Sequence, residues 1–131
     1  MKVLIIDDQQ EKIHLIRDSL ERLLTKVEIL ASPNYWDAVY QLDQAEDTFD
    51  FIVCDMQFPI KSTDRIDREA GIKMLHVITK MKLKAKIVIA TSSATVNKLL
   101  EDRGYGHIPA IVASPMYDLD SQFVKYITDY I

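Results

Sequence analysis

The sequence predicts an α/β fold in which a doubly wound, five-stranded parallel sheet is covered by helices on both faces. Five short apolar runs recur along the chain, and each is followed by a segment with apolar residues at helical spacing. The runs are apolar throughout and do not alternate, which is typical of strands buried on both faces. The predicted strands cover residues 3–6, 27–30, 51–54, 87–90 and 110–113.

The intervening segments predict one helix after each strand. In the first, Ile13, Ile16 and Leu20 recur at helical spacing between charged residues. Ser32 and Pro33 predict the start of the second helix, with serine as the N-cap and proline at the first helical position. Three further helices have inner faces marked by apolar residues: Ala38, Leu42 and Ala45 in the second, Ile72, Leu75, Ile78 and Met81 in the third, and Leu119, Phe123, Ile127 and Tyr130 in the fifth. A short fourth helix covers residues 95–102.

The composition is that of one globular domain, which we assign to residues 1–131. Hydrophobic residues make up 48% of the chain and charged residues 27%, which excludes a disordered protein. The net charge of −4 argues against general binding to nucleic acid, which needs a basic excess. Cys54 is the only cysteine, which excludes an internal disulfide, and we interpret it as a small core residue. The sequence has neither a signal peptide nor an apolar run near the ~18 residues of a membrane span, so we expect a soluble, cytoplasmic protein.

Polar residues that can carry chemistry follow four of the predicted strands. In an open parallel sheet, ligands bind beyond the carboxyl ends of the strands, where these residues would meet. Carboxylates that lie close together repel one another, and a divalent cation such as Mg²⁺ relieves the repulsion. With the cation bound, one carboxylate can act as a nucleophile toward a phosphoryl group. The candidates are Asp7 and Asp8 after the first strand, Asp55 and Gln57 after the third, Thr91 and Ser92 after the fourth, and Ser114 after the fifth.

Helix capping is the alternative role for these polar residues. Aspartate and serine at strand ends are often helix N-caps, and for Asp8, Ser92 or Ser93 taken singly capping is the simpler interpretation. Capping explains at most one member of the Asp7–Asp8 pair. The set as a whole therefore favours an acidic site.

Three stretches resemble the receiver domain of bacterial two-component response regulators: residues 5–9 (IIDDQ), 53–59 (VCDMQFP) and 88–92 (VIATS). The resemblance extends over the whole chain in order, and it is the combination of the stretches that is specific. It implies a flavodoxin-like (βα)5 fold and a stand-alone receiver without an output domain. It also implies phosphorelay signalling through protein contacts, with no enzymatic activity beyond weak self-phosphorylation and self-dephosphorylation.

The resemblance assigns a role to each candidate residue. Asp55 falls on the phosphoacceptor position. Asp7, Asp8, Asp55 and the Gln57 carbonyl fall on the Mg²⁺ ligands, with Asp8 the more direct of the acidic pair. Thr91 falls on the switch hydroxyl, beside Ser92, and Ser114 on the strand-five position that contacts the phosphoryl group. The implied partners are a histidine kinase or a His-containing phosphotransfer protein and a downstream protein target, with no nucleic acid or membrane; a homodimer is left open.

The chain departs from the family pattern at three places. Ser114 occupies the position of a lysine that pairs with the phosphoryl oxygens, and Ile111 occupies that of an aromatic switch residue. The polar segment at residues 57–69 is longer than the ~2–6 residues usual for such connections. A cation from this segment, Lys61, Arg65 or Arg68, is one replacement for the missing lysine; a solvated insertion is the interpretation that we favour.

These departures lead to further expectations. Phosphorylation of Asp55 by small donors should be slow, and Ser114→Lys should accelerate it. By analogy with the family, the Ser114–Pro115 peptide is expected to be cis.

The leading alternative to a phosphorylated receiver is a phosphorylation-independent pseudo-receiver that acts as a protein-interaction module. A weaker alternative is a Mg²⁺-dependent phosphatase with an Asp nucleophile, since Gln57 stands where such enzymes carry a second acid.

Overall fold

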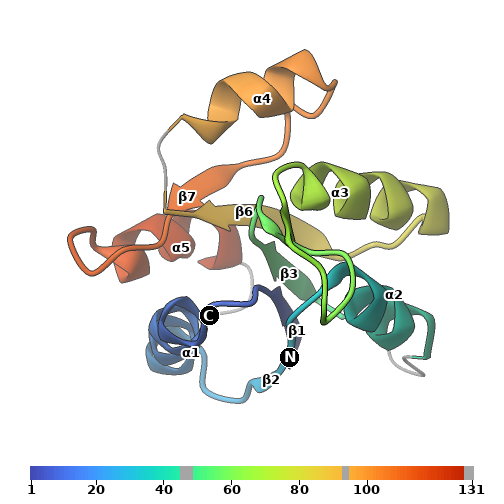
Figure 1. Ribbon diagram of the computed structural model, residues 1–131. Coiled ribbons are helices and arrows are strands. Elements are labelled where there is room, and N and C mark those ends of the chain that lie inside the picture. The colour runs from blue at the N-terminus through green and yellow to red at the C-terminus, as the bar shows by residue number, and fades with distance from the viewer. Residues whose placement is uncertain (45–48, 93–94, 129–131) are drawn as a thin grey trace.

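The computed structural model describes residues 1–44, 49–92 and 95–128 and has the predicted architecture (Figure 1). Its main sheet has five strands in the order β2-β1-β3-β6-β7, and all neighbouring strands are parallel. The strands are β1 (Lys2–Ile6), β2 (Glu28–Ser32), β3 (Phe51–Cys54), β6 (Lys86–Thr91) and β7 (Ala110–Val112). The helices are α1 (Gln10–Leu23), α2 (Tyr35–Gln44), α3 (Ala70–Met81), α4 (Val96–Asp102) and α5 (Leu119–Ile127). The doubly wound parallel sheet is therefore confirmed.

The helices form two layers, one on each face of the sheet (Figure 1). In β1, Leu4 and Ile6 belong to a core shared with α2, α3 and α4, whereas Val3 and Ile5 belong to a core shared with α1 and α5. All four side chains are fully buried, which explains the unbroken apolar run. Ala45 and Tyr130, expected on inner helix faces, lie outside the described residues. No helix in the described ranges has the length and apolar composition needed to cross a membrane.

The second helix begins later than the sequence predicts. Ser32 is the last residue of β2, pairs with Ile6 of β1 and is fully buried. Its carbonyl accepts the amide of Asp7 at 3.0 Å, so sheet pairing competes successfully with helix capping at this residue. The side chain of Asn34 accepts the amide of Asp37 at 2.8 Å and acts as the N-cap instead. The predicted Ser32 cap is therefore wrong.

The long segment at residues 57–69 is an anchored hairpin. It contains β4 (Phe58–Pro59) and β5 (Ile66–Asp67), which pair in antiparallel orientation. The Phe58 side chain is fully buried in the core against α2 and α3. The carbonyl of Ile60 accepts the amide of Trp36 at 3.1 Å. The interpretation as a solvated insertion is therefore wrong at the base of the hairpin and right only for its exposed tip at residues 61–65.

Candidate functional site

The ends of β1 and β3 bring three carboxylates together. The two strands pair with Ile6 opposite Cys54, so the next residues, Asp7 and Asp55, leave the sheet side by side. The amide of Asp55 extends the pairing by donating to the Ile6 carbonyl at 2.9 Å. Carboxylate oxygens of Asp7, Asp8 and Asp55 all lie within 4.8 Å of one another. The predicted convergence of these aspartates is therefore present in the structure.

Burial dominates the ionisation of this acidic cluster. Asp7 and Asp55 are 1% and 6% exposed. Burial, and then the negative charge of Asp55, raises the pKa of Asp7 to about 6, although Lys12 opposes the shift. Burial likewise raises the pKa of Asp55, against the opposing effect of Lys12. Any further cation that enters the cluster would favour the charged forms of both carboxyl groups.

Lys12, in the first turn of α1, supplies a buried positive charge to the cluster. Its Nζ lies 2.9 Å from Asp7 Oδ2 and 2.8 Å from Asp55 Oδ2. Lys12 is only 5% exposed. Burial alone would lower the pKa of Lys12, but the charges of Asp55 and Asp7 outweigh it and raise that pKa. Lys12 therefore stays protonated and links the two strand ends to α1.

Sequence reasoning missed Lys12, although a signal was present. Lys12 stands four residues before Ile16 and eight before Leu20, so it lies on the buried face of α1. Lysine is almost never fully buried without a charged partner. A lysine on an apolar helix face just after two aspartates indicates that it pairs with them.

The Asp55 carboxylate is held on both sides. Its Oδ1 accepts the amide of Met56 at 2.7 Å, while Oδ2 meets Lys12. Behind it, the amide of Gly71 donates to the Met56 carbonyl at 2.9 Å, which brings the start of α3 against the chain that follows β3. The carboxylate is thus fixed by β3, α1 and α3 before any ligand arrives.

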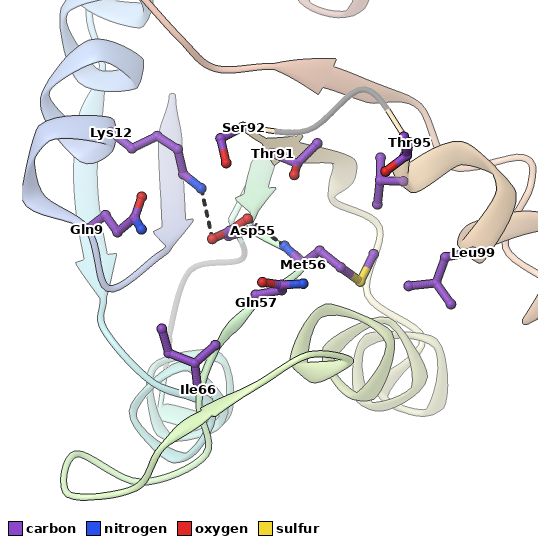
Figure 2. Close-up of a pocket in the computed structure, with 11 residues that line it drawn as sticks. Gln9, Lys12, Asp55, Met56, Gln57, Ile66, Thr91, Ser92, Thr95 and Leu99 are labelled. Carbon is purple, nitrogen blue, oxygen red and sulfur yellow. Dashed lines mark hydrogen bonds and ion pairs between the residues drawn. The ribbon is translucent and has the colours of Figure 1, made fainter.

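Asp55 opens into a cavity of about 240 Å³ at the edge of the sheet (Figure 2). Thr91, at the end of β6, and Ser92 line it together with Gln57. Thr91 is 7% exposed. Figure 2 shows the Lys12 side chain extending from α1 toward Asp55, with α4 on the opposite side of the cavity. Four of the predicted residues, Asp55, Gln57, Thr91 and Ser92, therefore share one hollow.

The hairpin gives the cavity an apolar wall and no cation. Ile66 of β5 lines the cavity and is 50% exposed. Lys61, Arg65 and Arg68 are exposed, and none of the three lines the cavity. The hypothesis that a hairpin cation replaces the missing lysine therefore finds no support in this geometry.

Ser114 lies apart from the cavity that holds Asp55. It lines a neighbouring hollow together with Lys12, and its hydroxyl accepts the amide of Met116 at 3.3 Å. The Ser114–Pro115 peptide is trans, since no described peptide bond is cis, so the expected cis bond is wrong. Ile111, at the expected position of an aromatic switch, is buried in the core shared with α1 and α5.

The acidic cluster fits a divalent metal ion. Asp8 Oδ1 is buried and has no hydrogen-bond partner among the described residues. Asp7 Oδ2 meets Lys12 at ion-pair distance but likewise accepts no hydrogen bond within the described part of the chain. Buried carboxylate oxygens in this state are costly unless a cation or a donor reaches them. The three carboxylates could therefore hold a hard metal ion such as Mg²⁺.

The comparison with solved structures identifies the fold. No protein-family model matches the chain, and the comparison with curated proteins found no relative. The structure is similar to the receiver domain of the Francisella response regulator 1452, with a TM-score of 0.72 and 17% identity over 98% of this chain and 95% of that one. The bacteriophytochrome response regulator AtBRR matches with a TM-score of 0.77 and 20% identity over 98% of this chain and 91% of that one.

A third match concerns a response regulator with a ligand. TrrA from Thermotoga maritima, solved in complex with Mg²⁺ and BeF, has a TM-score of 0.71 and 21% identity over 95% of this chain and 96% of that one. The chain therefore has the fold of response-regulator receiver domains over nearly its whole length, and the sequence resemblance is confirmed for the fold. The observed strand order corresponds to the receiver order 2-1-3-4-5 once the short hairpin strands are left out.

Proposed function

We propose that this chain is a receiver in phosphorelay signalling, which accepts a phosphoryl group on Asp55 and acts in the cytoplasm through protein contacts. The observation that carries the proposal is the cluster of Asp7, Asp8 and Asp55, of which Asp55 lines a cavity together with Thr91. A receiver fold alone would not imply phosphorylation, because folds host many functions. The cluster supports a site for phosphoryl transfer because it can hold both a metal ion and a nucleophilic carboxylate.

Each residue has a role in this proposal. Asp8, Asp55 and the Gln57 carbonyl would hold Mg²⁺, and Asp7 would act on it through water. The metal ion would neutralise charge on the transferring group. Asp55 is the nucleophile, oriented by the amide of Met56. Thr91 and Ser92 line the cavity, and their hydroxyls would donate to phosphoryl oxygens. A histidine kinase or a His-containing phosphotransfer protein would be the donor, and a downstream protein the target.

Two observations favour a second function, that of a phosphorylation-independent interaction module. Lys12 already pairs with two of the three carboxylates, so the cluster is partly neutralised without a metal ion. Ile111 also cannot make the movement of an aromatic switch residue. In this alternative the acidic cluster with Lys12 is a structural element of a pseudo-receiver.

Exposure to acetyl phosphate and Mg²⁺, followed by intact-mass measurement, separates these functions. A receiver gains one phosphoryl group, which Asp55→Asn abolishes. A pseudo-receiver gains none. Repeated release of inorganic phosphate without accumulation of the modified protein would instead indicate a phosphatase. Asp43→Asn, an exposed carboxylate on α2, is the matched control and should leave uptake unchanged.

A further inference from the structure

We propose that Lys12 is the cation that pairs with the phosphoryl group on Asp55, a task that position 114 cannot perform in this chain. The inference rests on the proposed function and deepens it, because it assigns the positive charge of the site to a residue of α1 and not to the residue at the end of the last strand. Nothing in the local sequence around Ser114 replaces that charge: the next residues are Pro115, Met116 and Tyr117.

The position of Lys12 is that of a group built into the site. The side chain is nine-tenths buried, and its Nζ lies 2.8 Å from Asp55 Oδ2. An ammonium group has three donors, and the ion pairs with Asp7 and Asp55 can engage at most two of them. Lys12 also lines the cavity into which Asp55 opens, on the side opposite Thr95 and Leu99 (Figure 2). The third donor can therefore serve an oxygen of a group attached to Asp55.

Lys12 and Ser114 approach the site from the same side. Both line a second hollow, of about 480 Å³, between α1 and the loop after β7. Gln9, Lys12 and Ser92 line both this hollow and the cavity that holds Asp55. The exposed cations of the hairpin, Lys61 among them, line neither of these two hollows. Lys12 thus shares one hollow with Asp55 and the other with Ser114, which supports its taking over the role of a lysine at position 114.

Charge arithmetic explains why the site needs this cation after the transfer. An Asp55 oxygen forms a bond to phosphorus, the bond between phosphorus and the acetate oxygen of acetyl phosphate breaks, and acetate leaves with the electron pair. No proton is taken up or released. Asp55 loses its single charge and gains a phosphoryl group of about −2, so the cluster becomes more negative by about one unit. A buried ammonium group at hydrogen-bond distance offsets that increase.

A double-mutant cycle with Lys12→Met and Ser114→Lys tests the inference. Phosphoryl uptake from acetyl phosphate at saturating Mg²⁺ is followed by intact mass, and folding of every variant is checked by circular dichroism. Lys12→Met should slow uptake by about 10- to 100-fold, the effect of losing one hydrogen bond to a charged group. Ser114→Lys should restore most of this rate in the Lys12→Met protein. In the unaltered protein it should change the rate little, which replaces the acceleration expected from the sequence, because Lys12 already supplies the cation beside Asp55. The triple variant Lys61→Ala, Arg65→Ala, Arg68→Ala is the matched control and should leave the rate unchanged.

Metal binding provides a second readout that a merely structural role would not reproduce. Lys12 repels a cation at Asp7 and Asp55, so Lys12→Met should bind Mg²⁺ at least as tightly as the unaltered protein while it accepts phosphate more slowly. A lysine that only supported the fold would weaken both when removed. Titration calorimetry with Mg²⁺ alone measures this.

The outcomes separate this inference from the proposed function. Equal uptake by Lys12→Met and the unaltered protein overturns the inference and leaves the proposed function standing. No uptake by the unaltered protein overturns both. Loss of uptake in the triple variant assigns the cation to the hairpin and also overturns the inference. If Lys12→Met folds only in combination with Ser114→Lys, the double variant is compared with the single variant Ser114→Lys. Similar phosphoryl uptake by the two supports the inference that one lysine can replace the other. A large loss of uptake in the double variant overturns the inference.

Discussion

Gly71 and Asp55 are in contact through their backbones: a Cβ atom on residue 71 would lie 2.6 Å from the carbonyl oxygen of Asp55. It would also lie 2.8 Å from the Cα atom of Met56. Only a residue without a side chain lets α3 begin this close to the end of β3. The contact fixes the backbone from which the proposed phosphoacceptor extends.

Gly71→Ala is expected to destabilise the protein by about 1–2 kcal/mol, because the obstructing atoms are backbone and cannot rotate away. The sign is informative, since replacing glycine by alanine inside a helix normally stabilises it by about 1 kcal/mol. Unfolding in urea measures the change. Gly106→Ala is the control: its nearest neighbour is a flexible side-chain atom of Glu101 at 3.0 Å, so the loss should be smaller.

The raised pKa of Asp7 predicts how stability depends on pH in the absence of divalent cations. Because the pKa is about 6 in the folded protein and 3.8 in the unfolded chain, the folded state retains the proton between these values. The contribution of Asp7 to the free energy of unfolding is therefore highest below about pH 4 and is lost as the pH rises through about 6. Asp7→Asn should remove this loss and be more stable than the unaltered protein at pH 7, by about 1–3 kcal/mol.

Urea unfolding at several pH values between 4 and 7 tests this dependence on Asp7. The difference between Asp7→Asn and the unaltered protein should grow with pH. A constant difference would contradict the prediction. Asp43→Asn, an exposed carboxylate remote from the cluster, should show no such trend.

Mg²⁺ should bind weakly and stabilise the fold, because the ion keeps most of its waters while relieving the crowding of Asp7, Asp8 and Asp55. At a concentration one hundred times the dissociation constant, the gain in the free energy of unfolding is about 2.7 kcal/mol. Thermal unfolding with and without Mg²⁺ measures it, and calorimetry measures the affinity directly. The double variant Asp8→Ala, Asp55→Ala should lose both effects; an unchanged affinity would exclude this site.

The contact between α1 and α5 should contribute to stability in a manner sensitive to acid. Asp120 accepts hydrogen bonds from Arg22 Nε at 2.9 Å, from Arg22 Nη2 at 2.8 Å and from the fully buried Ser19. Arg22, and then Ser19, hold the pKa of Asp120 below its usual range. The stabilisation is therefore present above the unfolded-state pKa near 4 and is lost as the pH falls below it.

Asp120→Asn is expected to cost about 0.5–1 kcal/mol at pH 7, a modest value because the Arg22 side chain is largely exposed. The cost should shrink at low pH and, for the part due to Arg22, at high salt. Asp43→Asn, an exposed aspartate on α2, is the control. A cost that is independent of pH would indicate that charge has no part in the contact.

Local patterns in the sequence predict the sheet and the acidic cluster for the same reason. Unbroken apolar runs identify buried parallel strands, and parallel strands place the residues that follow them at one edge. The proximity of Asp7 and Asp55 therefore follows from the sequence pattern alone. The start of the second helix could not be predicted from the local pattern at Ser32 and Pro33. The capping signal there competes with the pairing of Ser32 in β2 with β1, and the strand pairing prevails.

The order of the strands along the chain and the residue types at their ends can be read from the sequence, and the receiver-like fold and the acidic edge of the sheet follow from them. Which cation pairs with those acids depends on the packing of the helices against the sheet. With serine at position 114, the sequence offers the charged segment that follows Asp55, residues 57–69, as a source of a cation, whereas the cation that pairs with Asp55 in the structure is Lys12. The reach of a lysine side chain depends on how α1 rotates and packs against the sheet, and Ile13, Ile16 and Leu20 set that rotation through contacts with residues distant in the sequence.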